Sequence, residues 1–298
     1  MGIRARQLDW TAKALAATVP SLCPQPRNPY FFIGCGRSGT TLLAHLLSRH
    51  PQIAAYPYEA NELWHPGSVP WNRTLPEAMP IWLDPHAFTA SSLARRTSKD
   101  DRRLMATFGI YQRLVSGRCF LNKSALVTFM VDKIRELLPD SRFLHICRDG
   151  RAVALSAARK EARRIEQFPE PYESRGIRWP FEALIDRFAL YWQAHVLEIH
   201  ALKREKTLVE GVDLHELTYE DLCADPAYEL GRIAAFMRID SNEFPEVPPE
   251  LVSSMNYKYR EELDEQTLAR VSDLIRRGLE LRGYLRSPAG NLARARGS

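Results

Sequence analysis

Gly34-Cys35-Gly36-Arg37-Ser38-Gly39-Thr40-Thr41 is the stretch that decides the fold of this chain. The residues before it, Tyr30-Phe31-Phe32-Ile33, favour a β-strand, and the leucines between Leu42 and Leu47 recur at helical spacing. A strand, a tight loop and a helix are therefore expected in that order. Glycines let such a loop turn sharply and approach a ligand, while the first amides of the helix point at a bound anion. The stretch predicts a loop that grips a phosphate, and residues 34–41 are called the phosphate loop below.

The phosphate loop lacks the lysine of an ATP-binding P-loop. In that motif the second glycine is followed by Lys, which binds the β- and γ-phosphates, and by Ser or Thr, whose hydroxyl binds magnesium. Thr40 stands in the place of the lysine, and the positive charge comes from inside the loop, at Arg37. A P-loop kinase or NTPase is a rival interpretation. Thr40 disfavours it, and so does the lack of a clear strand that ends in a magnesium-binding aspartate.

Length and composition favour one large α/β domain. The chain has 298 residues, of which 45% are hydrophobic, and this is ample for a core. It contains no repeat and no linker long enough to separate domains. We therefore expect a single domain, with its core over residues 28–285, a helical lead-in over residues 1–27 and a basic tail over residues 286–298.

Charge and cysteine content indicate the compartment and the partners. The net charge of +5 comes from 41 basic and 36 acidic residues, so the chain is only mildly basic and a nucleic-acid partner is not expected. The five cysteines are scattered and form no paired metal spacing, which favours a reducing compartment. Lys13 interrupts the first apolar stretch, which is too short for a signal peptide or a membrane span. A cytoplasmic protein without a membrane span is predicted.

Strands alternate with helices along the chain. Arg142–Cys147 is apolar almost throughout, as a buried parallel strand should be, and Leu214–Leu217 is a further candidate strand. Helical patterns cover residues 91–115, 125–138, 152–164, 185–202, 225–237 and 263–281. This alternation predicts a three-layer α/β/α fold of the P-loop type around a central parallel, doubly wound sheet.

A second motif, residues 148–160, follows the strand Arg142–Cys147. Arg148 falls at the carboxyl end of that strand, the edge at which open α/β sheets bind ligands. Ser156 and Lys160 are four residues apart and share one helical face. Arginine, hydroxyl and ammonium that converge on one point suit a phosphate monoester. Taken alone, the motif is better explained as a basic helix whose charges face water. That interpretation loses ground because Arg148 ends a strand of the same kind as the one before the phosphate loop.

Together the two motifs resemble those of the sulfotransferases that use 3′-phosphoadenosine 5′-phosphosulfate (PAPS). The resemblance implies that the phosphate loop holds the 5′-phosphosulfate and that Arg148 and Ser156 bind the 3′-phosphate. Lys160 matches a position that is often arginine. Tyr219-Glu220-Asp221-Leu222 matches a family signature whose tyrosine lies near the nucleotide. The residues implied in nucleotide binding are Gly36, Arg37, Ser38, Gly39, Thr40, Thr41, Arg148, Ser156, Lys160 and Tyr219.

The form of the motifs is more similar to the tyrosylprotein sulfotransferases and their bacterial relatives than to the cytosolic aryl and steroid enzymes. The latter have lysine at the position of Arg37. Asn122-Lys123-Ser124 resembles a segment of the former group whose lysine helps to stabilise the sulfuryl group. Weaker likenesses are Met255-Asn256-Tyr257-Lys258 and Gly283-Tyr284. The resemblance spans residues 30–284.

The chemistry requires positive charge and a base. Sulfuryl transfer passes an electron-poor group in line between two oxygens, so Arg37 and Lys123 are expected to stabilise the charge that develops on the leaving phosphate, with no metal. The acceptor hydroxyl must lose a proton. Relatives use a glutamate shortly after the first helix, and Glu59 is the expected base here. Glu62 is the alternative, and a surface glutamate without a role is a third.

The acceptor cannot be read from the sequence. A tyrosine, a glycan hydroxyl or a small molecule all offer an oxygen nucleophile, and a bacterial enzyme that acts on a small molecule or glycan is expected. A catalytically inactive nucleic-acid-binding protein is a second rival, disfavoured because the basic residues form no stripe interleaved with aromatics. His50 and Trp192 are expected to be structural.

Overall fold

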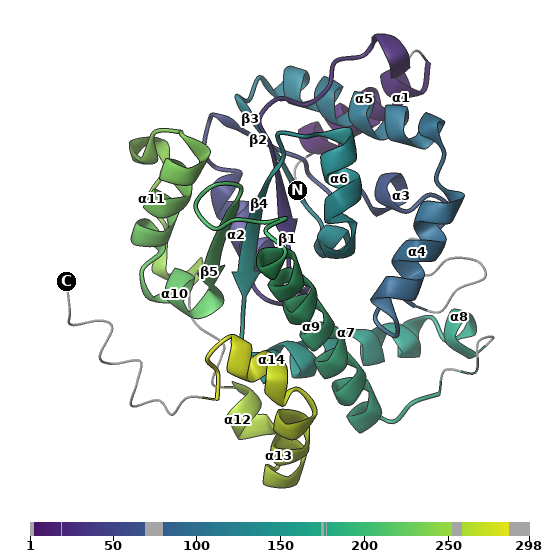
Figure 1. Ribbon diagram of the computed structural model, residues 1–298, viewed down its shortest axis with the longest axis vertical. Coiled ribbons are helices and arrows are strands. Elements are labelled where there is room, and N and C mark those ends of the chain that lie inside the picture. Colours follow the sequence, from purple (N-terminus) through teal and green to yellow (C-terminus); the bar gives the residue numbers. More distant parts are fainter. Residues whose placement is uncertain are drawn as a thin grey trace.

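A five-stranded parallel sheet forms the centre of the computed structural model, which describes residues 3–18, 20–68, 80–173, 176, 178–251 and 258–285 (Figure 1). The strand order is β2-β3-β1-β4-β5, and every pair of neighbours is parallel. The strands are β1 (Pro29–Ile33), β2 (Ile53–Ala55), β3 (Cys119–Lys123), β4 (Arg142–Cys147) and β5 (Leu214–Thr218). The predicted fold class is confirmed.

Helices cover both faces of the sheet. They are α1 (Ile3–Thr18), α2 (Thr40–Leu47), α3 (Asn61–Trp64), α4 (Pro85–Arg95), α5 (Ser98–Val115), α6 (Val131–Leu137), α7 (Gly150–Gln167), α8 (Glu170–Glu173), α9 (Phe181–Arg204), α10 (Tyr219–Ala224), α11 (Pro226–Met237), α12 (Lys258–Glu262), α13 (Glu265–Leu274) and α14 (Arg276–Leu281). Short 3₁₀ turns are η1 (Pro20–Leu22), η2 (Ala125–Met130), η3 (Ser241–Glu243) and η4 (Pro249–Leu251).

The core is divided by the sheet, because successive strand residues point to opposite faces. Tyr30 and Phe32 of β1 pack with α2 and α11, whereas Phe31 and Ile33 pack with α5 and α6. A third apolar cluster joins α7 to α9, α13 and α14 around Trp192, which is fully buried. All five residues of β1 are buried, as expected for a central parallel strand. Figure 1 shows α2, α10 and α11 on one side of the sheet and α1, α5 and α6 on the other.

Several predicted helices are divided in the structure. The pattern over residues 91–115 belongs to α4 and α5, because Thr97 and Asp100 form a capping box that starts a new helix. Residues 125–138 form a 3₁₀ turn followed by α6, and residues 263–281 form α13 and α14. Asp225 caps α11 and Pro226 opens it, as predicted.

The sequence analysis did not identify β2 and β3. Ile53–Ala55 is only three residues long, and Cys119–Lys123 ends in polar residues. Both strands matter for the site, since β3 lies beside β1 with Lys123 paired to Phe32. Residues 286–298 and 255–257, where the basic tail and part of one weak likeness were expected, lie outside the described residues.

Two further findings concern membrane spans and cysteines. No helix in the described ranges has the length and apolar character needed to cross a membrane. Each of the five cysteines is a free thiol, and Cys35, Cys119 and Cys147 are buried.

Candidate active site

The phosphate loop connects β1 to α2 through three residues with left-handed backbone. These are Gly34 at φ +112°, Arg37 at φ +73° and Gly39 at φ +93°. A Cβ at Gly34 would lie 2.7 Å from His145 Cδ2, and one at Gly39 would lie 2.6 Å from Tyr219 Cδ2. Both glycines are therefore required by backbone conformation and by space. Arg37 adopts the same conformation despite its side chain, a strain that is typical of ligand sites.

The loop is shaped to hold an anion. Ser38 is 1% exposed, and its Oγ has no hydrogen-bond partner among the described residues. A Cβ at Gly36 would meet nothing within 4 Å, so there is open space beside the backbone there. The helix α2 begins at Thr40 and directs its first amides to the same end. A buried hydroxyl without a partner beside free amides fits the phosphate and sulfuryl oxygens of the predicted donor.

The second motif lies directly beside the loop. Arg37 Nε donates to Ser156 Oγ at 3.0 Å, which joins the loop to α7. The guanidinium of Arg148 lies 4.4 Å from the centroid of the Tyr219 ring, a cation–π contact. Burial, and then the charge of Arg148, lower the pKa of Arg37. The two guanidinium groups repel each other, so an anion bound between them would be favoured.

These residues line a cavity of about 720 Å³, called the basic cavity below. Seven of its lining residues are cations and one is a carboxylate, Glu262, which pairs with Arg159. The cations are Arg37, Arg148, Arg159, Lys160, Arg163, Arg164 and Lys258. The structure thus brings together the predicted nucleotide-binding residues Arg37, Arg148, Ser156, Lys160 and Tyr219.

The segment that contains Glu59 contacts the end of β3 through an ion pair and hydrogen bonds from three consecutive residues. Lys123 Nζ lies 2.8 Å from Glu59 Oε1. Asn122 is fully buried, and it accepts a hydrogen bond from Trp64 Nε1 at 2.8 Å and donates one to the Tyr58 carbonyl at 3.2 Å. The next residue, Ser124, donates from Oγ to the Asn61 side chain at 3.2 Å. Every residue of the Asn122-Lys123-Ser124 motif therefore contacts residues 58–64.

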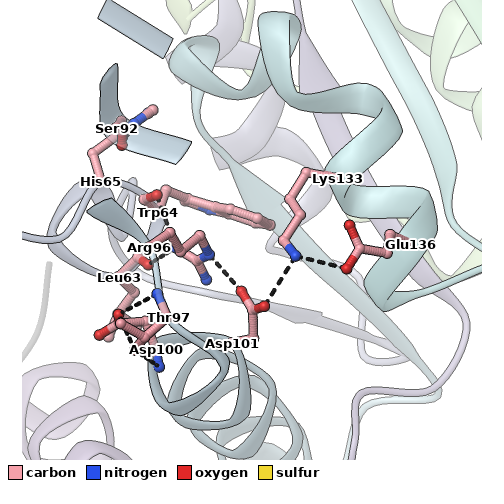
Figure 2. A network of polar contacts seen from close by, with 10 residues as sticks. All are labelled: Leu63, Trp64, His65, Ser92, Arg96, Thr97, Asp100, Asp101, Lys133 and Glu136. Carbon is pink, nitrogen blue, oxygen red and sulfur yellow. Dashed lines mark hydrogen bonds and ion pairs between the residues drawn. The ribbon is translucent and has the colours of Figure 1, made fainter. Parts of the chain in front are cut away.

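A polar network holds the far end of that segment (Figure 2). Arg96 Nη1 donates to the carbonyls of Leu63 and Trp64, at 2.7 and 2.9 Å, and so caps the end of α3. The same guanidinium pairs with Asp101 on α5, and Asp101 lies 3.0 Å from Lys133 Nζ on α6. The network connects α3 to two helices on one face of the sheet, and these helices support the segment that contains Glu59.

The alternative base, Glu62, faces another partner. Its Oε1 lies 2.7 Å from Lys13 Nζ on α1. Burial raises the pKa of Glu62, but the hydrogen bond and the charge from Lys13 outweigh it and hold the pKa below the ordinary value. Glu59 is paired as well, with Lys123 Nζ at 2.8 Å, so ion pairing alone does not distinguish the two carboxylates. The choice of Glu59 over Glu62 as the base stays a prediction.

Glu59 and Lys123 line a second cavity, of about 540 Å³. Thr41 of the phosphate loop lines it as well. Arg37 lines the basic cavity instead, and neither of these two cavities is lined by both Arg37 and Lys123. The expectation that these two cations act on one phosphate therefore stays a prediction.

Asp149 has a structural role that was not predicted from the sequence. It caps α7, pairs with Arg151 at 2.6 Å and accepts a hydrogen bond from Tyr259 Oη at 3.0 Å. The adjacent Glu220 accepts from the Asp149 amide and from Tyr284 Oη. The C-terminal helices are thus fastened to the second motif. Asp149 is occupied by these contacts, and no metal-binding cluster of His, Cys, Asp or Glu occurs among the described residues.

Two residues expected to be structural have structural surroundings. His50 is buried and its Nε2 donates to the Asp240 carbonyl at 2.8 Å, while Trp192 fills the core. Thr128, which sequence reasoning missed, accepts a hydrogen bond from the Gly34 amide at 2.8 Å. No local sequence signal marks it, since 94 residues separate it from the loop.

Comparisons with known proteins bear on the family and the fold. A family model described as "Sulfotransferase family" matches residues 29–243. The search of curated proteins found no match.

Solved structures share the fold. The sulfotransferase STF9 from Mycobacterium avium has a TM-score of 0.54 and 13% identity, with 90% of this chain and 80% of that chain covered. The sulfotransferase domain from the curacin biosynthetic pathway has a TM-score of 0.50 and 16% identity, with 84% and 97% covered. The sulfotransferase STF1 from Mycobacterium tuberculosis H37Rv has a TM-score of 0.50 and 13% identity, with 91% and 82% covered.

Proposed function

This chain belongs to the sulfotransferase family, and from that premise we propose how its residues carry out PAPS-dependent sulfuryl transfer to an acceptor hydroxyl. One observation carries the proposal. Arg37, Arg148 and Ser156, which come from two motifs far apart in the sequence, meet around the basic cavity beside a buried serine hydroxyl that has no partner among the described residues. Such a site suits a nucleotide with phosphates at both ends.

The residues of the phosphate loop bind the donor. The amides from Gly36 to Thr41 and the Ser38 hydroxyl donate to the oxygens of the 5′-phosphosulfate. Arg148 and Ser156 hold the 3′-phosphate, and Tyr219 keeps the Arg148 guanidinium in place through its ring. Lys160 adds charge to the same cavity. When bound, PAPS supplies an activated sulfuryl group.

Glu59 and Lys123 act at the acceptor. The Glu59 carboxylate takes the proton of the acceptor hydroxyl as its oxygen attacks sulfur. An ammonium has three donors, so Lys123 can hold Glu59 and still donate to the sulfuryl oxygens. Arg37 stabilises the charge that develops on the leaving phosphate.

The donor is tested by isothermal titration with adenosine 3′,5′-bisphosphate and with ATP. We expect the bisphosphate to bind without magnesium and at least tenfold more tightly than ATP. Preference for ATP, or a requirement for magnesium, would favour the kinase or NTPase interpretation. Salt-dependent DNA retention without competition from nucleotide would favour the nucleic-acid-binding alternative.

The base is tested with a matched pair of variants. Transfer of labelled sulfate from PAPS to hydroxyl compounds in a cell extract should fall by about 10²–10⁴-fold in Glu59→Gln. Glu62→Gln should retain near wild-type transfer, because Glu62 faces Lys13. Both variants should bind the bisphosphate as the wild type does. The opposite ranking would assign the base to Glu62.

We also propose that residues 28–285 act as one domain in a bacterial cytoplasm. The family match over residues 29–243 and five free cysteines support this assignment. The closer likeness to tyrosylprotein sulfotransferases stays a prediction. Fractionation of the source cell and limited proteolysis of the purified chain test location and domain extent.

A further inference from the structure

The cavity lined by Glu59 and Lys123 has mostly apolar and aromatic walls. It is called the apolar cavity below, and its volume of about 540 Å³ is in the range of small-molecule sites. Apart from the Glu59–Lys123 pair, its polar lining residues are Thr41, His45 and Ser48, all on or next to α2. The other lining residues are apolar or aromatic: Ala5, Ala44, Ile53, Ala55, Tyr56, Pro57, Tyr58, Tyr111, Val115 and Leu121.

Two of the three tyrosine hydroxyls in this wall, those of Tyr56 and Tyr111, have hydrogen-bond partners. Tyr56 Oη donates to Asp9 on α1, and Tyr111 Oη donates to the Ala55 carbonyl at 3.1 Å. Burial raises the pKa of Tyr111 to about 12 and also raises the pKa of Tyr56. Both groups therefore stay neutral and keep their hydrogen bonds, so their rings rather than charges form the cavity surface.

Helix α1 completes the wall. Ala5 lines the cavity, and Lys13 lies 5.7 Å from the centroid of the Tyr58 ring while it pairs with Asp9 and Glu62. Since Lys13 has two carboxylate partners, its charge is largely neutralised outside the cavity. The Glu59–Lys123 pair is the charged group that faces the apolar cavity from its described lining, and the two charges sum to zero.

The basic cavity has the opposite character. It has seven lining cations and one carboxylate. This excess of positive charge matches the negative charges of the donor nucleotide. An anionic acceptor would gain nothing from the apolar cavity, because burying an uncompensated charge against rings and methyl groups is costly. The basic cavity therefore suits a charged ligand, and the apolar cavity suits an uncharged one.

We propose that the apolar cavity, between α1, α2 and β2, is the acceptor site and that the acceptor is a small uncharged alcohol or phenol built on a ring. This assignment rests on the proposed function, in which Glu59 is the base. The ring packs against Tyr56, Tyr58 and Tyr111, with its hydroxyl directed at Glu59. The acceptor O–H bond breaks and its proton passes to Glu59. A new S–O bond forms, the bond from sulfur to the 5′-phosphate oxygen breaks, and adenosine 3′,5′-bisphosphate leaves with the electron pair.

The first experiment compares acceptors on the intact enzyme. With labelled PAPS, the probe 2-naphthol should be sulfated with kcat/KM at least 100-fold above that of an acidic tyrosine peptide or a sulfated disaccharide. Transfer to either charged acceptor with the higher kcat/KM would overturn the assignment and leave the sulfotransferase function intact. Failure to bind adenosine 3′,5′-bisphosphate would instead overturn the proposed function itself.

The second experiment tests the location of the acceptor site. His45 is exposed on α2 and Val115 lies near the end of α5, and both line the apolar cavity. His45→Trp and Val115→Trp should each raise KM for 2-naphthol at least tenfold, with the affinity for the bisphosphate unchanged. Arg113→Trp is the matched control, since Arg113 is also exposed on α5 but lines a different cavity. Unchanged KM in both cavity variants, or an equal rise in the control, would overturn the proposed location.

Discussion

Replacing Asn122 by alanine should reduce turnover by releasing the Glu59 segment. Asn122 is fully buried and makes two contacts with that segment, to Trp64 Nε1 at 2.8 Å and to the Tyr58 carbonyl at 3.2 Å. The variant leaves the buried Trp64 indole N–H and the Tyr58 carbonyl without these partners. Each such group costs about 1–3 kcal/mol, so the free energy of unfolding should fall by about 2–6 kcal/mol.

The activity effect follows from position. Tyr58 immediately precedes Glu59, and a displacement of about 1 Å in a catalytic group reduces rates by about 10²-fold. We therefore expect kcat to fall by roughly 10–100-fold while the affinity for adenosine 3′,5′-bisphosphate stays the same. The melting temperature should fall by roughly 4–24 °C, since each kcal/mol corresponds to about 2–4 °C. Circular dichroism melts, titration calorimetry and labelled-sulfate transfer at a temperature well below the melt measure the three quantities.

A matched control separates positioning from stability. Gln112 is another buried amide, 5% exposed, whose side chain bonds to Arg27 N and O at 2.6 and 2.9 Å, away from Glu59. Gln112→Ala should lower the melting temperature comparably and leave kcat unchanged. In a Glu59→Gln background, Asn122→Ala should cause no further loss of rate, because the base is already absent. Equal kcat losses in both single variants, or an undiminished effect in the double variant, would refute the reasoning.

Three further outcomes are expected. Arg148→Ala should weaken adenosine 3′,5′-bisphosphate binding by about 10–100-fold, from the 1.5–3 kcal/mol of a charged hydrogen bond, and leave adenosine 5′-phosphate binding nearly unchanged; equal losses in calorimetry would contradict its role at the 3′-phosphate. Gly34→Ala should lower the melting temperature by roughly 5–15 °C, because its φ is +112° and the new Cβ would lie 2.7 Å from the His145 side chain, whereas Gly36→Ala should melt as the wild type does. Burial lowers the pKa of His195 to about 4, so the unfolded chain takes up a proton near pH 6.5 that the folded chain does not. Stability in urea melts should therefore fall, by up to about 1.4 kcal/mol per pH unit for this group, as the pH is lowered from 6.5 towards 4.5, and an unchanged slope in His195→Phe would count against this cause.

Local signals account for the parts of the site that the sequence identified. The phosphate loop and the residues from Arg148 to Lys160 are contiguous, and their function depends on backbone turns and helix spacing that short runs of sequence encode. The structure confirms β1, β4 and β5 and the helices α2, α7 and α11, because each is a strong local pattern. The division at Thr97 was missed, since a capping box competed with a helical pattern that continues through it.

The resemblance predicts Glu59 as the base, and the choice between Glu59 and Glu62 stays a prediction. Glu59 and Glu62 are three residues apart on one short segment, and nothing in their neighbours distinguishes them. Their ion-pair partners differ. Glu59 pairs with Lys123, 64 residues further along the chain, and Glu62 pairs with Lys13 on the first helix. The contact with Lys123 depends on β3, a strand that the sequence analysis did not identify.

The sequence by itself determined the chemistry of this protein, because a strand, a glycine-containing loop and a helix form an anion site from consecutive residues. Tertiary structure alone decided which cavities lie around that anion site. Parallel pairing of β3 with β1 places Lys123 beside the phosphate loop, and the packing of α1, α2 and α5 around β2 closes an apolar cavity over Glu59. The physical reason is that cavities are formed by side chains from distant segments, whose distances are set by packing and not by spacing along the chain.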